Sequence, residues 1–146
     1  IAPPLLEEHQ PQKDEVIFVF SNSGVNHVPV EMALTARLRG LCVITICSFA
    51  FSSVAPLSAL GKRLPELADF AIDNGGVPGD AMIGVGDDLV GPSSTIVGAT
   101  IWNCLALETA RRLHLRRGDA PILVSQNLAG GQAHNRAMAE RWEGIK

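Results

Sequence analysis

A strand, a turn of small polar residues and a helix follow one another early in the chain, and this unit constrains the fold more than any other part of the sequence. Residues 16–20 are all apolar and rich in β-formers, which is typical of a parallel strand covered on both faces. The Ser-Asn-Ser-Gly sequence of residues 21–24 predicts a turn. A helix is predicted over residues 28–39, with Pro29 in its first turn and Gly40 at its end.

The same order of strand and helix continues along the chain. The sequence predicts a second buried strand at 41–47, a Ser-rich loop at 48–53, a helical turn at 62–67 and a third strand at 68–73. Parallel strands joined in this order require right-handed crossover connections. We therefore expect an α/β fold built on a parallel sheet.

The second half of the chain is expected to contain the longest helix. Several glycines and a proline predict a loop at 74–80, and residues 82–90 are expected to form a short extended excursion. The long helix is predicted over 94–115, and either Ser93 or Ser94 supplies its N-cap. Residues 121–125 are a last strand candidate, followed by a C-terminal helix at 133–142.

The first two-thirds of the long helix are apolar nearly all round. Such a helix is expected to be buried on more than one side, which in a small domain predicts association into a homodimer or homotetramer. The apolar positions are Ile96, Val97, Ala99, Ile101, Trp102, Leu105, Ala106 and Leu107.

The length and composition limit the number of domains and the classes of function. A chain of 146 residues fits one domain, predicted over residues 15–146. The Pro-rich, polar residues 1–14 are expected to be a linker or a helix remnant outside the core. The net charge of −3 gives no basic surplus for binding nucleic acid. No apolar run reaches the roughly 18 residues of a membrane helix.

The cysteines and histidines predict neither a disulfide framework nor a metal site. Cys42, Cys47 and Cys104 form no C-x-x-C pair, and the four histidines share no metal-ligand spacing. We therefore expect a reducing, cytoplasmic environment and no cofactor. The glycines of residues 84–86 begin a dinucleotide fingerprint that Leu89 breaks, and the P-loop and G-x-S-x-G patterns are absent from the sequence.

Small hydroxyl residues gather where predicted strands end and where helices begin. In an open parallel sheet, ligands bind beyond the carboxyl ends of the strands, and free amides at a helix start favour an anion. These residues suit a phosphate or a polyol, although an ordinary turn or helix cap explains each cluster taken alone. The predicted binding residues are Ser21, Asn22, Ser23, Gly24, Asn26, Ser48, Ser93, Ser94 and Thr95, with Ser52 and Ser53 in the same loop as Ser48.

Three residues are candidates for acid–base chemistry. Glu31 lies early in the first predicted helix, where its charge also suits the helix dipole. His27 lies at the mouth of the preceding turn, and His134 lies at the start of the last helix. A plain surface position is the alternative for both histidines. Glu31 and His134 are our candidate catalytic bases.

Residues 16–48 resemble the SIS (sugar isomerase) domain. The shared pattern is a hydrophobic strand, a Ser-x-Ser-Gly loop, a helix, a glycine, a second strand and a serine. Further pieces are similar to one bacterial subgroup of sugar isomerases, namely residues 61–64, 67–69, 72–75, 78–81, 91–95 and 134–136.

The SIS resemblance implies a fold, a ligand class and two alternative functions. The fold is a three-layer αβα sandwich with a mainly parallel, doubly wound, flavodoxin-like sheet, and the proteins form oligomers. The ligand is a phosphorylated sugar or sugar derivative, with Ser21, Ser23 and Ser48 on the sugar-phosphate loops and residues 93–95 at a helix start facing them. The family includes aldose–ketose isomerases, which act through an enediol(ate), and non-catalytic phosphosugar-sensing domains.

The sequence departs from the SIS pattern in two places. A complete SIS domain carries N-terminal helices and a further strand before the Ser-x-Ser-Gly strand, and residues 1–14 are too few for them. We therefore expect either a fragment of a longer protein or a partner that supplies the strand. Residues 51–58 also lack the basic residues and the histidine expected in this subgroup.

Overall fold

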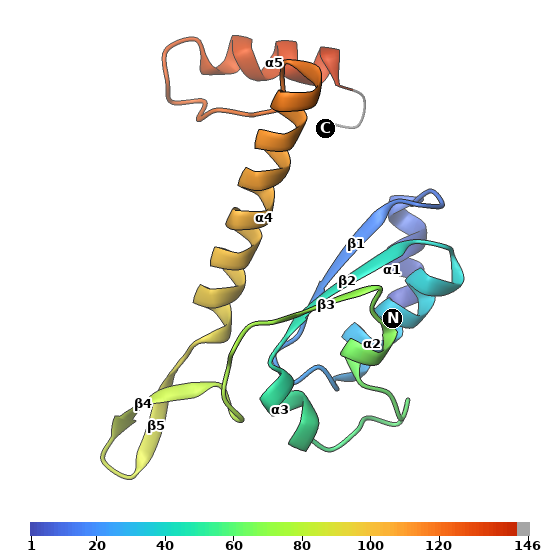
Figure 1. The fold of residues 1–146 in the computed structure, drawn as a ribbon, viewed down its shortest axis with the longest axis vertical. Coiled ribbons are helices and arrows are strands. Elements are labelled where there is room, and N and C mark those ends of the chain that lie inside the picture. The colour runs from blue at the N-terminus through green and yellow to red at the C-terminus, as the bar shows by residue number, and fades with distance from the viewer. Residues whose placement is uncertain (143–146) are drawn as a thin grey trace. The chain divides into compact units, whose positions relative to one another are not determined.

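The computed structural model describes residues 1–142, and the chain divides into two compact units between residues 101 and 102. The first unit contains a three-stranded sheet in the order β1-β2-β3, formed by β1 (Val16–Phe20), β2 (Cys42–Cys47) and β3 (Phe70–Asp73). Both strand pairs are parallel. The predicted α/β class and the three predicted strands are therefore confirmed, and the arrangement is consistent with a three-layer αβα fold (Figure 1).

Helices α1 (Ala2–His9) and α2 (His27–Leu38) pack against each other, and α2 also contacts β1 and β2. Figure 1 shows both helices on one side of the sheet. The predicted helix after the first strand is thus confirmed. The expectation that residues 1–14 lie outside the core is wrong, because Ala2 and Leu6 of α1 are buried. Leucine and alanine one turn apart give this Pro-rich helix an apolar face.

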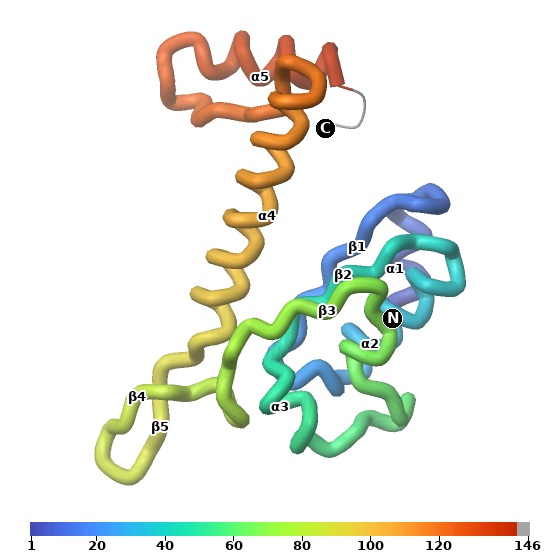
Figure 2. The backbone as a smooth tube through the Cα atoms, in the orientation of Figure 1, coloured from blue at the N-terminus to red at the C-terminus, as the bar shows by residue number. Residues whose placement is uncertain are grey.

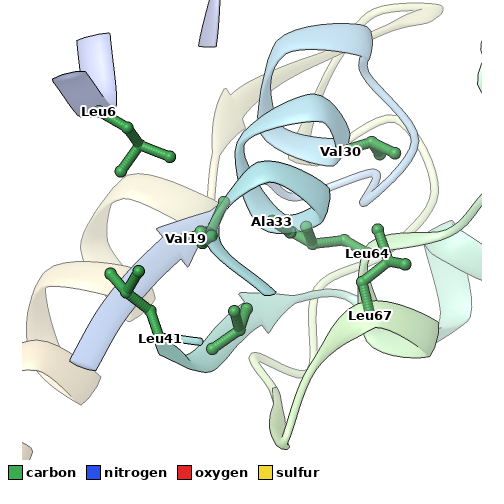
Figure 3. Close-up of a cluster of buried hydrophobic side chains, with 9 residues drawn as sticks. Leu6, Val19, Val30, Ala33, Leu41, Leu64 and Leu67 are labelled. Carbon is green, nitrogen blue, oxygen red and sulfur yellow. The ribbon is translucent and has the colours of Figure 1, made fainter. Parts of the chain in front are cut away.

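The core of the first unit lies between this pair of helices and the sheet. Val19 from β1 and Val30 from α2 meet residues of the short 3₁₀-helix η1 (Leu64–Leu67), the element predicted as a helical turn (Figure 3). Leu64 and Val30 have side chains with no exposed surface. Each fully buried side chain of this size contributes about 1.5–3 kcal/mol relative to its exposed state.

The Ser-rich segment after β2 is a helix, so the loop expected over residues 48–53 is wrong. Helix α3 (Phe49–Val54) begins at Ser48, whose Oγ accepts a hydrogen bond from the Phe51 amide at 3.0 Å. A serine with extended backbone is a preferred N-cap, and this capping bond satisfies an amide that would otherwise be unpaired. The serines therefore start a helix instead of interrupting one.

The extended excursion expected over residues 82–90 is a two-stranded antiparallel hairpin of β4 (Ala81–Val85) and β5 (Asp88–Pro92). In Figure 2 the chain runs from β3 through this hairpin into α4 (Ser94–Arg117), the predicted long helix. Ile96 and Leu107 of α4 are 71% and 72% exposed in the described chain. The predicted association through this helix stays a prediction.

The second unit, described from residue 102 to residue 142, contains the end of α4 and helix α5 (Gly131–Arg141). The strand expected at 121–125 is absent from this described region. The Asn135 side chain takes both backbone groups of Val124, accepting from its amide at 2.9 Å and donating to its carbonyl at 2.8 Å. A side-chain amide thus replaces the strand partner. Within residues 1–142, every helix lacks the combination of length and hydropathy that a membrane span requires.

Candidate functional site

The three loops that follow β1, β2 and β3 meet at one edge of the sheet, which we call the carboxyl edge. The Ser48 amide donates to the Asn22 carbonyl at 2.9 Å, which joins the first two loops. The Asn74 amide donates to the Cys47 carbonyl at 3.0 Å, which joins the second and third. Parallel pairing places all three strand ends on the same side, as the sequence predicts for Ser21–Gly24 and Ser48.

Four buried polar atoms at the carboxyl edge have no hydrogen-bond partner within the described chain. They are Ser21 Oγ, Asn22 Nδ2, Ser23 Oγ and Ser52 Oγ, and we call them the polar cluster. Native proteins pair most buried polar atoms, and leaving one unpaired costs about 1–3 kcal/mol. Three of these atoms lie in the loop after β1 and the fourth lies in α3, so together they indicate a place where a ligand or ordered water supplies the missing partners.

Gly24 brings Ser52 against the first loop. Gly24 has a φ of +63°, and a Cβ built on it would lie 3.0 Å from Ser52 Oγ. The Leu64 amide donates to the Gly24 carbonyl at 2.7 Å, which ties this loop to the core. Only glycine combines the left-handed backbone with so close an approach. The sequence does not predict Ser52 as a binding residue; in the structure, its 2% exposed fraction beside Gly24 identifies it.

The N-terminus of α2 also lies at the carboxyl edge, where it favours negative charge. Asn26 is the N-cap, with extended backbone, and both Asn26 and His27 are exposed. The first amides of a helix are donors, and its dipole favours negative charge at this end. The donor groups of the loop and the helix end together suit an anion.

The Ser48 hydroxyl is already engaged, although Ser48 lies at the carboxyl edge as predicted. Its Oγ donates to the Gly76 carbonyl at 2.5 Å while it accepts from the Phe51 amide. Ser48 has no exposed surface. In this arrangement Ser48 holds α3 and the third loop in place, and its hydroxyl hydrogen is not available to a ligand.

The hydroxyls of Ser93 and Ser94 bind the Asp80 carboxylate. Asp80 Oδ1 accepts from the Ser93 amide at 3.0 Å and from the Ser94 amide at 2.8 Å, and Asp80 Oδ2 accepts from Ser94 Oγ at 2.5 Å. Asp80 therefore acts as the cap of α4, where the sequence predicted Ser93 or Ser94. One turn later Gly98 lies against Phe20, the last residue of β1, so α4 passes close to the end of this strand. Thr95 is exposed.

The hydrogen bonds from Ser94 and Ser93 hold the pKa of Asp80 below its ordinary value of 3.8. A lowered folded-state pKa means that the carboxylate stabilises the fold at pH values above about 4 and that this contribution is lost as the pH falls through the lower folded pKa. We expect Asp80→Asn to lower the free energy of unfolding by about 0.5–1 kcal/mol at pH 7, because the charge at the helix end is lost.

Urea unfolding at pH 7 and pH 3 measures this contribution of Asp80. The difference between wild type and Asp80→Asn should shrink at pH 3, because this pH lies below the ordinary pKa of 3.8 and protons then favour the unfolded state. Asp87→Asn, in the exposed hairpin turn, is the matched control and should change little. If wild type and Asp80→Asn differed in stability by the same amount at both pH values, the charged form of Asp80 would not be the cap of α4.

The two candidate bases lie in different surroundings. Glu31 Oε2 accepts a hydrogen bond from the Ala2 amide at 2.9 Å. This hydrogen bond lowers the pKa of Glu31 from its ordinary value of 4.5. A general base working near neutrality needs a raised pKa. His134 lies on α5 in the second unit, where its Nε2 lies 2.9 Å from the Ile122 carbonyl.

The cysteines form no disulfide and no metal site in the described region. All three are free. Burial, and then the charge of Asp73, raise the pKa of Cys47 to about 11, so its thiol stays protonated at neutral pH. Residues 1–142 contain no group of three histidine, cysteine, aspartate or glutamate side chains positioned to hold a metal ion.

A comparison with known protein families finds a match at the start of the chain. The family model described as SIS domain matches residues 1–48, which span α1, β1, the Ser-Asn-Ser-Gly loop, α2 and β2. The resemblance to the SIS domain found in the sequence is therefore confirmed for this part of the chain, and the match includes α1, of which Ala2 and Leu6 are buried.

The curated relatives extend the similarity along the chain. The chain is 39% identical over 140 residues to a UPF0309 protein of Shouchella clausii, a match that covers 94% of this chain and 57% of the relative. UPF0309 proteins of Brucella canis and Brucella anthropi are each 39% identical over 142 residues, covering 95% of this chain and 57% of the relative. The chain thus spans somewhat more than half the length of these relatives.

Proposed function

We propose that the carboxyl edge binds the phosphoryl group of a phosphorylated sugar or sugar derivative. The polar cluster carries this proposal, because a phosphoryl group offers the several acceptor oxygens that its four donor-capable atoms require. The start of α2 supplies a favourable field for the negative charge. The SIS match over residues 1–48, which includes Ser21, Asn22 and Ser23, supports this ligand class.

Ser21 and Ser23 are the proposed donors of the first loop. Both residues are half-buried, and a hydroxyl hydrogen rotates freely to meet an acceptor. A hydrogen bond to a charged group contributes about 1.5–3 kcal/mol. Two such bonds therefore account for roughly a hundredfold of affinity or more.

Titration of the whole protein with glucose 6-phosphate, fructose 6-phosphate and inorganic phosphate tests the proposed site. We expect Ser21→Ala/Ser23→Ala to weaken binding about a hundredfold or more, because both donors are lost. The same variant should unfold at a higher urea concentration without ligand, because two unpaired buried hydroxyls have been removed. Equal affinity of wild type and variant would refute the site.

Thr45→Val is the matched control for this experiment. Thr45 Oγ1 is also buried and without a partner in the described chain, but it lies within β2, between Val19 and Ala71 of the neighbouring strands. Its removal should stabilise the free protein by about 1 kcal/mol or more and leave the affinity unchanged. Comparing the two variants distinguishes hydroxyls that bind the ligand from a buried hydroxyl that only lacks a partner.

For the reaction, we propose aldose–ketose isomerisation by the whole protein. Such a reaction moves a proton between two neighbouring sugar carbons through an enediol(ate), and it needs a base of near-neutral pKa and donors for the developing oxyanion. The polar cluster can supply donors. Glu31 and His134 both stay candidate bases. The hydrogen bond from the Ala2 amide lowers the pKa of Glu31, which makes it a weaker base, and His134 belongs to the second unit.

A non-catalytic phosphosugar-sensing module is the second candidate function. One observation favours it: the carboxylate of Glu31, the acidic candidate nearest the Ser-Asn-Ser-Gly loop in the chain, is bound to the Ala2 amide. Incubating the whole protein with sugar phosphates in D₂O separates the candidates. Deuterium incorporation at the carbon next to the carbonyl supports the isomerase, whereas binding without exchange supports the sensor.

A further inference from the structure

The side chain of Asn74 joins two polar contacts at the carboxyl edge. Its Oδ1 accepts from the Gly76 amide at 2.8 Å, and its Nδ2 donates to Asn22 Oδ1 at 2.8 Å. The opposite atom of the same Asn22 amide group, Nδ2, is buried and belongs to the polar cluster. Of these two hydrogen bonds, the one to Asn22 connects Asn74 to the polar cluster.

The chemistry of this chain of bonds allows one orientation for each amide group. A backbone N–H only donates, so the Asn74 atom facing Gly76 is its oxygen. The remaining Asn74 group is an NH₂, which also only donates, so the Asn22 atom facing it is an oxygen. The NH₂ of Asn22 then faces away from Asn74. The backbone amide of Gly76 therefore sets, through Asn74, which end of the Asn22 amide group faces the polar cluster.

We infer that Asn74 is a positioning residue of the proposed phosphoryl site, which holds Asn22 so that its NH₂, and not its carbonyl, meets the ligand. This inference rests on the proposed function. With Asn22 in this orientation, all four atoms of the polar cluster can donate, as an anion requires. With the opposite orientation, a carbonyl oxygen would face the anion and repel it.

The surrounding loop is built to keep Asn74 in place. A Cβ on Gly76 would lie 2.9 Å from Asn74 Oδ1 and 3.0 Å from Asn22 Oδ1, so glycine is required where the two amides meet. The Gly76 carbonyl is fixed by the Ser48 hydroxyl, which links this loop to the start of α3. The segments after β2 and β3 therefore fix the position of Asn74, and Asn74 in turn fixes the orientation of the Asn22 amide.

A double-mutant cycle with glucose 6-phosphate as the probe tests the inference. We expect Asn74→Ala to weaken binding by the whole protein about tenfold, the scale of one hydrogen bond to a charged group. In the Asn22→Ala background the same change should alter the affinity less than about twofold, because Asn74 acts through Asn22. An equal loss in both backgrounds, or no loss in wild type, overturns the inference.

The NMR signal of the Asn22 side-chain NH₂ gives a second readout, which does not depend on binding. In the free protein, Asn74→Asp presents a carboxylate oxygen to Asn22, which should turn the Asn22 amide and shift its NH₂ resonances. Unchanged resonances overturn the inference whether or not a sugar phosphate binds. The proposed function fails by a different result, namely that wild type binds none of the sugar phosphates.

Discussion

Replacing Gly24 with alanine is expected to destabilise the first unit by about 2–5 kcal/mol and to weaken sugar-phosphate binding about tenfold. The left-handed backbone at φ +63° costs an alanine about 1–2 kcal/mol. The new Cβ, 3.0 Å from Ser52 Oγ, adds an overpacking cost of about 1–3 kcal/mol. Because Ser52 is 2% exposed, its hydroxyl has little room to move without leaving the polar cluster.

Gly61→Ala is the matched control for Gly24→Ala. Gly61 has a φ of +62°, but nothing lies within 4 Å of a Cβ built on it. The two glycines therefore share the backbone cost and differ in the steric cost. Urea unfolding and titration with glucose 6-phosphate measure both effects. If the two variants lost the same stability and kept the same affinity, the close approach of Ser52 to Gly24 would be excluded as a feature of the site.

Leu64→Ala is expected to lower the free energy of unfolding by about 2–5 kcal/mol, because a fully buried leucine leaves a cavity. Leu64 fills the space where η1 meets α2, and its amide also holds the Gly24 carbonyl (Figure 3). Such a loss is a large part of the roughly 5–15 kcal/mol that stabilises a typical protein. Affinity for the sugar phosphate should fall less than stability, since Leu64 contributes only a backbone amide to the loop.

Leu57→Ala serves as the control, because Leu57 is 47% exposed and the same atoms are removed. Its cost should stay within about 0.5 kcal/mol. Far-ultraviolet circular dichroism follows the unfolding, and amide hydrogen exchange in β2 reports on the first unit. A cost for Leu64→Ala no greater than that of Leu57→Ala would contradict the position of Leu64 in the core.

The predictions that succeeded depend on short-range patterns. The apolar runs that became β1 and β2, and the helix α2 between them, follow from strand composition, Pro29 in the first helical turn and the glycine after the helix. The parallel pairing followed from the order of these elements. Ser21 and Ser23 could be placed at the carboxyl edge for the same reason, because their position is fixed by where β1 ends.

Two of the predictions that failed depend on partners further along the chain. Residues 121–125 have the composition of a strand, but Asn135 supplies the hydrogen bonds that a neighbouring strand would have made. The amides at the start of α4 bind Asp80, on the far side of the hairpin. No local pattern identifies Asn135 or Asp80 as these partners. The loop expected after β2 failed for a local reason: Ser48 caps a helix through the amide of Phe51, three residues later.

The sequence by itself determined the strand–loop–helix unit, the parallel order of the sheet and the serines at its carboxyl edge, because each depends on residues a few positions apart. Only the tertiary structure decided which hydroxyls are free. It engaged Ser48, Ser93 and Ser94 with groups from other loops, and it left the polar cluster of Ser21, Asn22, Ser23 and Ser52 without partners in the described chain. The physical reason is that a hydrogen bond depends on two groups meeting in space, and the second group comes from residues far along the chain.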